Sequence, residues 1–320
     1  MKDIFKARMG FSGNLTEISK LICTEYGLGR LIDSKVIPVG YEDFNFLLRT
    51  SHGKFFVKIF RSSRKLNDCT RNVDIIRQVS AAGISIPKLY TSSNGNYLSI
   101  LPINKSILRL CVMDFIEGKD LFTSKAKINK EDIHSLASLA SALNQLNIKP
   151  AKIYDSWAIP NFPEEFKKKS KYLNSKELAL MKPLLRQFAM LDIPTLPHCF
   201  VHGDILRTNI IKDKHNKLWL IDFSVSNYYP RIQELAVLAC DVLFNKDNEE
   251  ESEKNLTLVL NEYQRKIKLN PRELWSLPLY IKIAHAMHLL CATYEQKVNK
   301  NNSAENKYFM KIGRAGMRRY

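Results

Sequence analysis

The sequence lacks the features of a secreted, membrane-spanning or repetitive protein. Its first residues carry charges but no apolar stretch, so we expect no signal peptide. The most apolar late stretch, residues 277–293, is interrupted by Lys282, His285 and His288, which favours a buried helix over a membrane span. The 320 residues contain no repeat and no low-complexity segment. We therefore expect a globular, cytoplasmic protein with a substantial core and no membrane partner.

Paired cysteines are also lacking. None of the six cysteines forms a C-x-x-C pair, and they are scattered at positions 23, 69, 111, 199, 240 and 291. This pattern predicts reduced thiols in the core, not a disulfide framework or a zinc site. His285 and His288 lie three residues apart, but no other residue is spaced to complete a metal site, so we interpret both as core or groove histidines.

Acidic residues are outnumbered by basic ones. The chain has 49 Lys and Arg against 32 Asp and Glu, a net charge of +17. The basic residues are spread along the chain, apart from residues 167–169 and an Arg-rich end at 314–320, and no motif interleaves aromatic with basic residues. We therefore favour a solvated, lysine-rich surface that attracts an anionic cosubstrate such as ATP, and we consider nucleic acid an unlikely partner.

The hydrophobic pattern changes near residues 114–118. Before this point, helical spacing appears at 14–26 and 66–82, and strand-like runs appear at 31–39, 44–50, 54–60, 86–90 and 108–115. After it, helical spacing prevails, at 129–146, 175–191, 232–244, 253–268 and 272–296. We predict an α+β protein with a sheet-rich N-terminal nucleotide-binding lobe (1–115) and a larger helical lobe (116–320). A nucleotide clamped in a cleft between lobes suits this plan.

One segment of the helical part carries three polar groups at the spacing of a phosphoryl-transfer site. Asp204 follows His202 and Gly203, Asn209 comes five residues later, and Asp222 ends an apolar run. In kinase-like enzymes the first carboxylate orients the substrate hydroxyl and accepts its proton. The amide and the second carboxylate hold Mg²⁺ against the nucleotide phosphates. We therefore predict Asp204 as the catalytic base and Asn209 and Asp222 as the metal ligands.

Two neighbours of Asp204 have other predicted roles. His202 is expected to hold the loop through hydrogen bonds and not to carry a proton. Arg207 lies beside the base and is a candidate catalytic residue that neutralises phosphate charge, with a structural salt bridge as the alternative.

A lysine lies inside a predicted strand of large apolar residues. Lys58 interrupts the run 55–60, and lysine seldom takes such a place unless it is paired. The kinase role would be to bind the nucleotide's α- and β-phosphates and to pair with an acid on a helix; an edge-strand lysine facing water is the alternative. Asp68 shares a helix face with Asn72, whereas Asp74 points to the polar side, so Asp68 is the predicted partner.

The backbone contacts of a nucleotide are less clearly encoded. Residues 40–45, between the first two predicted strands, are not G-x-G-x-x-G, so a glycine-rich phosphate loop is only weakly supported. Residues 111–118 fit a hinge strand whose backbone hydrogen-bonds adenine, with Met113 and Phe115 as the predicted contacts. An ordinary strand leaving the sheet is the alternative.

These residues resemble the aminoglycoside phosphotransferase/choline kinase superfamily, whose fold is protein-kinase-like. Its signature is H-G-D-x-x-x-x-N, here at 202–209, followed by I-D-F, here at 221–223. Residues 234–236 read E-L-A where the superfamily usually has D-L-A. The resemblance covers about residues 14–245.

Within the superfamily, the chain looks most like type II homoserine kinases and hydroxylysine-kinase-like proteins. Residues 26–29 and 40–48 resemble the opening of that branch, and Arg207 matches an arginine of homoserine kinase loops. Gly203 stands where homoserine kinases of this type commonly have Ala, and Lys58 is more typical of the aminoglycoside and hydroxylysine branches.

The resemblance implies ATP (or GTP), Mg²⁺ and a small substrate with a hydroxyl, often also an amine. We expect a small-molecule kinase acting on an amino alcohol or amino acid such as homoserine or hydroxylysine. An aminoglycoside phosphotransferase is the alternative; the basic composition weighs against it, because a polycationic substrate needs an acidic pocket. A non-catalytic nucleotide- or RNA-binding protein is the alternative of another class. The oligomeric state stays open.

Overall fold

The computed structural model describes residues 14–37, 43–103 and 106–319. Its contacts divide the chain into two compact units, and each unit consists of two separate segments of the sequence. The first comprises Met1–Gly118 with Asp213–Ile221, and the second comprises Lys119–Lys212 with Asp222–Tyr320. The chain thus leaves the second unit three residues after Asn209 and returns to it at Asp222, which the hydrophobic pattern did not indicate.

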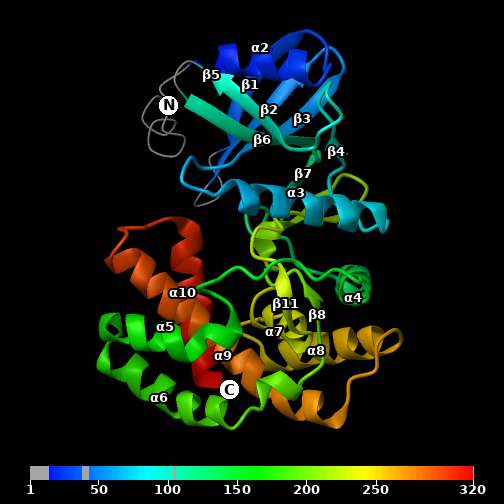
Figure 1. The fold of residues 1–320 in the computed structure, drawn as a ribbon. Coiled ribbons are helices and arrows are strands. Elements are labelled where there is room, and N and C mark those ends of the chain that lie inside the picture. Colours follow the sequence, from blue (N-terminus) through cyan, green and yellow to red (C-terminus); the bar gives the residue numbers. More distant parts are fainter. Residues whose placement is uncertain (1–13, 38–42, 104–105, 320) are drawn as a thin grey trace. The chain divides into compact units, whose positions relative to one another are not determined.

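The first unit is built on an antiparallel sheet (Figure 1). Its strand order is β1 (Leu31–Ile37), β2 (Phe44–Thr50), β3 (Gly53–Ile59), β6 (Ser106–Asp114) and β4 (Leu89–Tyr90), and β5 (Ser99–Ile103) pairs with β6. Alternate residues Phe44, Phe46 and Leu48 of β2 are buried, as the two-residue period of a strand requires. They share a core with Ile18 and Ile22 of helix α2 (Leu15–Glu25). A second helix, α3 (Leu66–Ala81), follows β3.

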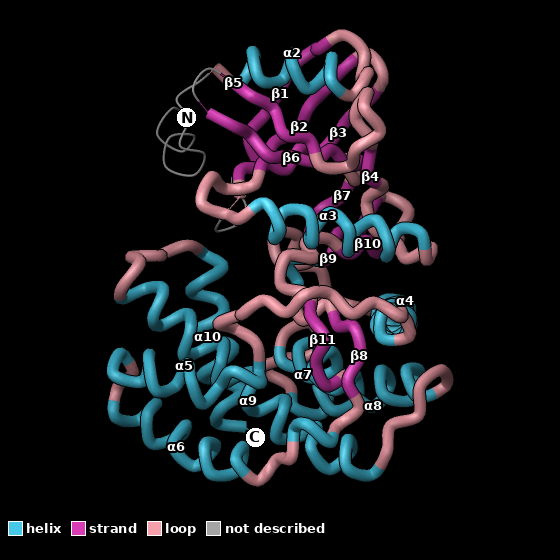
Figure 2. The backbone as a smooth tube through the Cα atoms, in the orientation of Figure 1, coloured by secondary structure: helices cyan, strands magenta, loops and turns pink. Residues whose placement is uncertain are grey.

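The second unit is mainly helical (Figure 2). Its helices are α4 (Lys130–Asn144), α5 (Phe162–Lys169), α6 (Ser175–Ala189), α7 (Ile232–Cys240), α8 (Glu249–Gln264), α9 (Pro271–Lys297) and α10 (Ala304–Arg319). An antiparallel ribbon joins β8 (His198–Val201) to β11 (Asn227–Pro230). Three short strands lie, in the sequence, close to the borders between the two units. They are β7 (Gly118–Asp120), β9 (Ile210–Asp213) and β10 (Leu218–Leu220).

Burial explains why the helices of this unit pack as they do. All nine residues of α7 are buried, and α9 is buried along most of its length. Helices α9 and α10 approach each other closely at Gly316. A Cβ atom at this position would lie only 2.1 Å from the His285 ring, so a larger residue does not fit. The predicted order, an antiparallel sheet followed by helices, is confirmed.

Three sequence interpretations concern the core. His285 and His288 are buried, and burial lowers the pKa of His285 to about 3 and that of His288 to about 4, so both are core histidines as predicted. None of the six cysteines, all within the described residues, forms a disulfide; five are buried and Cys199 is half-buried. Across residues 14–37, 43–103 and 106–319, no helix has the length and apolar character needed to cross a membrane.

Candidate active site

The loop that follows β8 brings two of the predicted site residues together. Asn209 ends a short 3₁₀ turn (Arg207–Asn209) and donates its side-chain Nδ2 to Asp204 Oδ2 at 2.6 Å and to the Asp204 carbonyl at 3.0 Å. The contact fixes the orientation of the Asp204 carboxylate. A carboxylate held in this way can receive the proton of a hydroxyl placed beside its second oxygen.

A buried histidine supports this loop. His202 has no exposed surface, and its Nδ1 accepts the main-chain N–H of Asp204 at 3.2 Å. Its ring packs edge-on against Phe223, with 4.6 Å between ring centroids. His202 therefore joins the loop to the residue that follows Asp222, in keeping with its predicted structural role.

A buried glutamate holds the start of the same loop. Glu234, in the first turn of α7, accepts the main-chain N–H of His202 at 2.7 Å and also that of Gly203. Gly203 has a φ of +80°, in the left-handed region that favours glycine. Burial raises the pKa of Glu234 to about 8, and the two main-chain donors oppose that rise. The glutamate of the E-L-A sequence therefore anchors the main chain at the start of the loop.

The third predicted residue, Asp222, sits in a strained turn. It is exposed and has a φ of +63°, which is uncommon for a residue other than glycine. Its Oδ1 accepts the main-chain N–H of Ser224 at 3.3 Å, and the next residue, Phe223, is buried. Backbone strain of this kind costs free energy and is concentrated at functional sites.

The carboxylates of this site act on one another. The pKa of Asp204 is raised well above its usual range, first by burial and then by the negative charges of Asp155 and Asp222, while the Asn209 hydrogen bond lowers it. Carboxylates that repel each other in this way fit a divalent cation, whose charge relieves the repulsion. In the described part of the chain, no three His, Cys, Asp or Glu residues are grouped to hold a metal alone. Asn209 and Asp222 stay the predicted ligands of a divalent cation, which would need further oxygen ligands from outside this pair.

Arg207 has main-chain partners. Its guanidinium donates to the Ala126 carbonyl at 3.1 Å and to the Val242 carbonyl at 2.9 Å. Its own main-chain N–H donates to Oδ1 of the buried Asp241 at 2.9 Å. These contacts give Arg207 a structural role through main-chain carbonyls, and the described residues give its guanidinium no salt bridge of the kind considered from the sequence. That it also neutralises phosphate charge stays a prediction.

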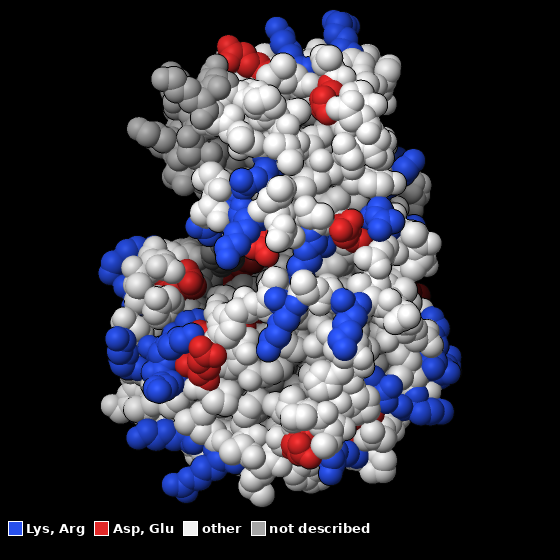
Figure 3. Space-filling view, viewed as in Figure 1, with Lys and Arg blue, Asp and Glu red and all other residues white. Residues whose placement is uncertain are grey.

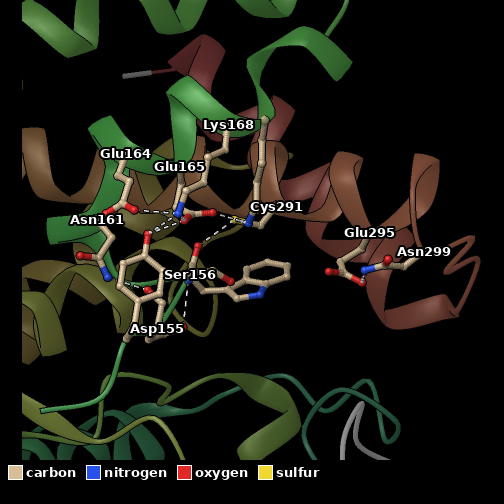
Figure 4. Close-up of polar contacts among 12 residues, drawn as sticks. Asp155, Ser156, Asn161, Glu164, Glu165, Lys168, Cys291, Glu295 and Asn299 are labelled. Atoms are coloured by element: carbon tan, nitrogen blue, oxygen red, sulfur yellow. Dashed lines mark hydrogen bonds and ion pairs between the residues drawn. The ribbon is translucent and has the colours of Figure 1, made fainter. Parts of the chain in front are cut away.

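Sequence reasoning missed Asp155, which lies in a loop without a motif. Asp155 is buried; its Oδ1 accepts the Trp157 N–H at 2.9 Å and its carbonyl accepts Asn161 Nδ2 at 2.7 Å (Figure 4). The neighbouring Ser156 carbonyl accepts the Cys291 thiol at 3.1 Å. This places a fixed carboxylate close enough to Asp204 to affect its pKa.

The Asp155 loop is tied to the ribbon that carries the catalytic loop. Asn227 of β11 accepts the Ile153 N–H at 3.3 Å and donates to the Ile153 carbonyl at 3.0 Å. In the ribbon, Asn227 pairs with Val201, three residues before Asp204. No sequence pattern indicates this tertiary link.

In the first unit, the structure changes the predicted partner of Lys58. The lysine is buried in β3, and its Nζ lies 3.4 Å from Oδ2 of Asp43, the residue before β2. Asp68 is half-buried in the first turn of α3, and the described residues give it no ion pair. The predicted Lys58–Asp68 pair is therefore wrong: the helix period indicated a shared face but not which element approaches the ammonium.

The predicted hinge residues lie at the end of β6. Met113 is buried and pairs with Phe56 of β3 and Leu89 of β4, and Phe115 follows the strand. The Phe115 N–H donates to the Lys54 carbonyl at a long 3.4 Å. Their contact with adenine stays a prediction. Residues 40–42 of the weak phosphate-loop segment lie outside the described residues.

An antiparallel sheet, a helical unit, and an Asp–Asn contact on a braced loop followed by a second Asp define a kinase-like phosphotransferase. A family model described as "Phosphotransferase enzyme family" matches residues 33–265, so the chain belongs to this family. It is an ATP-dependent phosphotransferase that acts on a hydroxyl group of a small molecule.

Curated relatives support the homoserine kinase-like branch, as the resemblance implied. The chain is 24% identical over 278 residues to a homoserine kinase of Rhizobium etli, covering 86% of this chain and 84% of that protein. It is 25% identical over 276 residues to a homoserine kinase of Agrobacterium fabrum, covering 85% of this chain and 83% of that protein.

Solved structures share the fold. The amicoumacin kinase hAmiN, in complex with AMP-PNP, Ca²⁺ and Ami, has a TM-score of 0.72 at 17% identity, over 100% of this chain and 96% of that one. The choline kinase LicA of Streptococcus pneumoniae has a TM-score of 0.63 at 14% identity, over 96% of this chain and 100% of that one. The predicted protein-kinase-like fold is confirmed.

Proposed function

We propose that this phosphotransferase transfers the γ-phosphate of ATP (or GTP) to the side-chain hydroxyl of homoserine or of a closely related amino acid or amino alcohol such as hydroxylysine. The observation that carries the proposal is the Asp204–Asn209 contact at 2.6 Å, on a loop braced by His202 and Glu234. The relatives named homoserine kinase support the choice of substrate.

Each site residue has a proposed part in this reaction. Asp204 orients the acceptor hydroxyl and takes its proton, while Asn209 and Asp222 hold Mg²⁺. The cation, when bound, neutralises charge on the transferring phosphoryl group. Lys58 contacts the α- and β-phosphates, and the main chain at Met113 and Phe115 contacts the base.

Asp155 supports an acceptor that carries an amine. Its carboxylate is buried and fixed beside the proposed base, where an ammonium group is a suitable partner for a carboxylate that has been removed from water. Homoserine, hydroxylysine and ethanolamine all combine an ammonium with a hydroxyl. A carboxylate at this position would be unfavourable for a purely anionic acceptor.

A second candidate function is antibiotic phosphorylation. The fold likeness to the amicoumacin kinase favours including it, although an identity of 17% shows the fold alone. Lys and Arg side chains are scattered over the face drawn in Figure 3, with acidic ones among them. That distribution supports neither a polycationic substrate nor a nucleic-acid partner. The six free cysteines support a reducing, cytoplasmic setting.

The test is ATP turnover with Mg²⁺ across homoserine, hydroxylysine, ethanolamine, choline and an aminoglycoside. We expect phosphorylation of homoserine or a close amino-alcohol relative. Asp204→Asn should abolish turnover while nucleotide binding persists, because the amide keeps the shape of the side chain but cannot accept the proton. Full activity of Asp204→Asn would refute the assignment of the base. Absence of ATP binding by the unaltered protein would refute the function.

A further inference from the structure

The first unit contains a buried ion pair that links two neighbouring strands. Asp43 immediately precedes β2, and Lys58 lies near the end of β3, where it pairs across the sheet with Asn45. The distance from Lys58 Nζ to Asp43 Oδ2 is 3.4 Å, and the side chains are 7% and 6% exposed. A buried ammonium is costly unless a carboxylate compensates it, so the position of Asp43 determines where the Lys58 ammonium is stable.

Asp43 is itself held from two other sides. Its Oδ1 accepts the main-chain N–H of Arg61 at 3.1 Å, and its Oδ2 lies 3.5 Å from the guanidinium of Arg64. Both partners belong to the segment that directly follows β3. The carboxylate is therefore a fixed anchor for the lysine and not a mobile surface acid.

The buried face of helix α3 carries no acid. Its buried residues are Cys69, Asn72, Val73, Ile75, Ile76 and Val79, none of which is charged. Asn72 is 1% exposed and has no hydrogen-bond partner for its side-chain amide among the described residues. In the kinase template, the strand lysine depends on a helix acid for its position. Here the buried face of the helix presents a neutral amide instead.

We propose that Asp43 is the residue that positions Lys58 for the nucleotide phosphates, in place of a helix acid. The inference rests on the proposed function, in which Lys58 contacts those phosphates. Asp43 acts through the lysine: it holds the ammonium at one place in the sheet. Asp43 and Lys58 then act together in binding the nucleotide phosphates.

The proposal is tested with the full chain, ATP, Mg²⁺ and whichever acceptor the unaltered protein phosphorylates. Asp43→Asn keeps an oxygen for the Arg61 N–H but removes the charge that holds Lys58. We expect kcat/KM for ATP to fall roughly 10- to 100-fold, because small misplacements of a phosphate-binding group are costly. Asp43→Glu, which keeps the charge, should recover part of the loss. KM for the acceptor should stay within about threefold of its original value.

A double-mutant cycle separates positioning from a general structural effect. In a Lys58→Met background, Asp43→Asn should lower kcat/KM for ATP by less than about threefold further, because the residue through which it acts is gone. Asp74→Asn removes an exposed acid from α3 and serves as the matched control with unchanged kinetics. Thermal unfolding of each variant checks that the fold is kept.

Three outcomes would overturn the inference. Asp43→Asn could keep full kcat/KM for ATP while Lys58→Met loses it. The two changes could be additive. Asp68→Asn could instead reproduce the loss seen with Lys58→Met, which would restore the helix acid. A different failure, in which Lys58→Met itself keeps full activity, would refute the phosphate role of Lys58 in the proposed function and the inference with it.

Discussion

Replacing Arg207 distinguishes the two roles considered for it. In the structure its guanidinium spans two carbonyls that lie far apart in the sequence, those of Ala126 and Val242. Arg207→Met removes both hydrogen bonds, and Arg207→Lys keeps the charge but replaces the planar fork by a single ammonium. If the residue positions the loop, both variants should lose activity. If it neutralises phosphate charge directly, lysine should restore much of what methionine loses.

The magnitude follows from the two contacts. A hydrogen bond to a charged donor contributes about 1.5–3 kcal/mol, and the lower value suits a partly exposed loop, so the pair contributes roughly 3 kcal/mol. For a unit of this size, that loss lowers the unfolding midpoint by roughly 6–12 °C. We expect both variants to show this shift, together with a decrease in kcat on the order of 100-fold and little change in KM for ATP.

The assay is coupled ADP release at saturating ATP and acceptor, with thermal unfolding of the same preparations. Lys246→Met provides a control, because the ion pair of this lysine is a local one with the neighbouring and exposed Asp247. The positioning role would be refuted if Arg207→Lys matched the unaltered protein in kcat while Arg207→Met did not. An unchanged unfolding midpoint in Arg207→Met would refute the energetic argument.

Three further changes test the site and the core. Asp155→Asn keeps the bond from Trp157 but removes the charge, so KM for homoserine should rise roughly 10- to 100-fold with KM for ATP unchanged; equal losses for both would contradict an amine contact. Gly316→Ala should destabilise the protein by about 1–3 kcal/mol, since its Cβ would lie 2.1 Å from the His285 ring; an unchanged urea midpoint would contradict this packing. Acidification below pH 6.5 should destabilise the fold. In the unfolded chain both histidines bind protons below this pH, whereas in the folded protein the buried His285 and His288, with pKa values of about 3 and about 4, stay neutral. The loss is roughly 3 kcal/mol per histidine by pH 4, and His288→Gln should reduce the slope of stability against pH.

Local spacing predicted the part of the site that depends on one loop. Asp204 and Asn209 are five residues apart, so a short 3₁₀ turn is enough to bring them into contact. Alternating hydrophobicity likewise located β2 and β3, because one face of each strand is buried. The two-residue strand β4 was predicted too long, and β5 was missed, because such short edge pairings leave little periodic pattern.

Contacts between distant segments could not be predicted from spacing. The helix period placed Asp68 on the correct side of α3, but the partner of Lys58 depends on the register between β2 and β3. The loop of Asp155 is held by Asn227, whose hydrogen-bond partner Ile153 is 74 residues away in the sequence. Arg207 contacts carbonyls 81 and 35 residues away, and its position beside Asp204 in the sequence did not indicate either partner.

The course of the chain between Asn209 and Asp222 has a consequence for protein synthesis. Residues 213–221 belong to the first unit, where the Leu220 N–H donates to the Ser85 carbonyl at 2.9 Å. A nascent chain that has reached Gly118 therefore still lacks a segment of that unit, and it must lengthen by about a hundred residues before this segment emerges. Neither unit corresponds to one uninterrupted stretch of the sequence, so a truncation at Gly118 leaves the first unit incomplete. The two proposed metal ligands, Asn209 and Asp222, flank this segment, so the chain between them passes through the first unit.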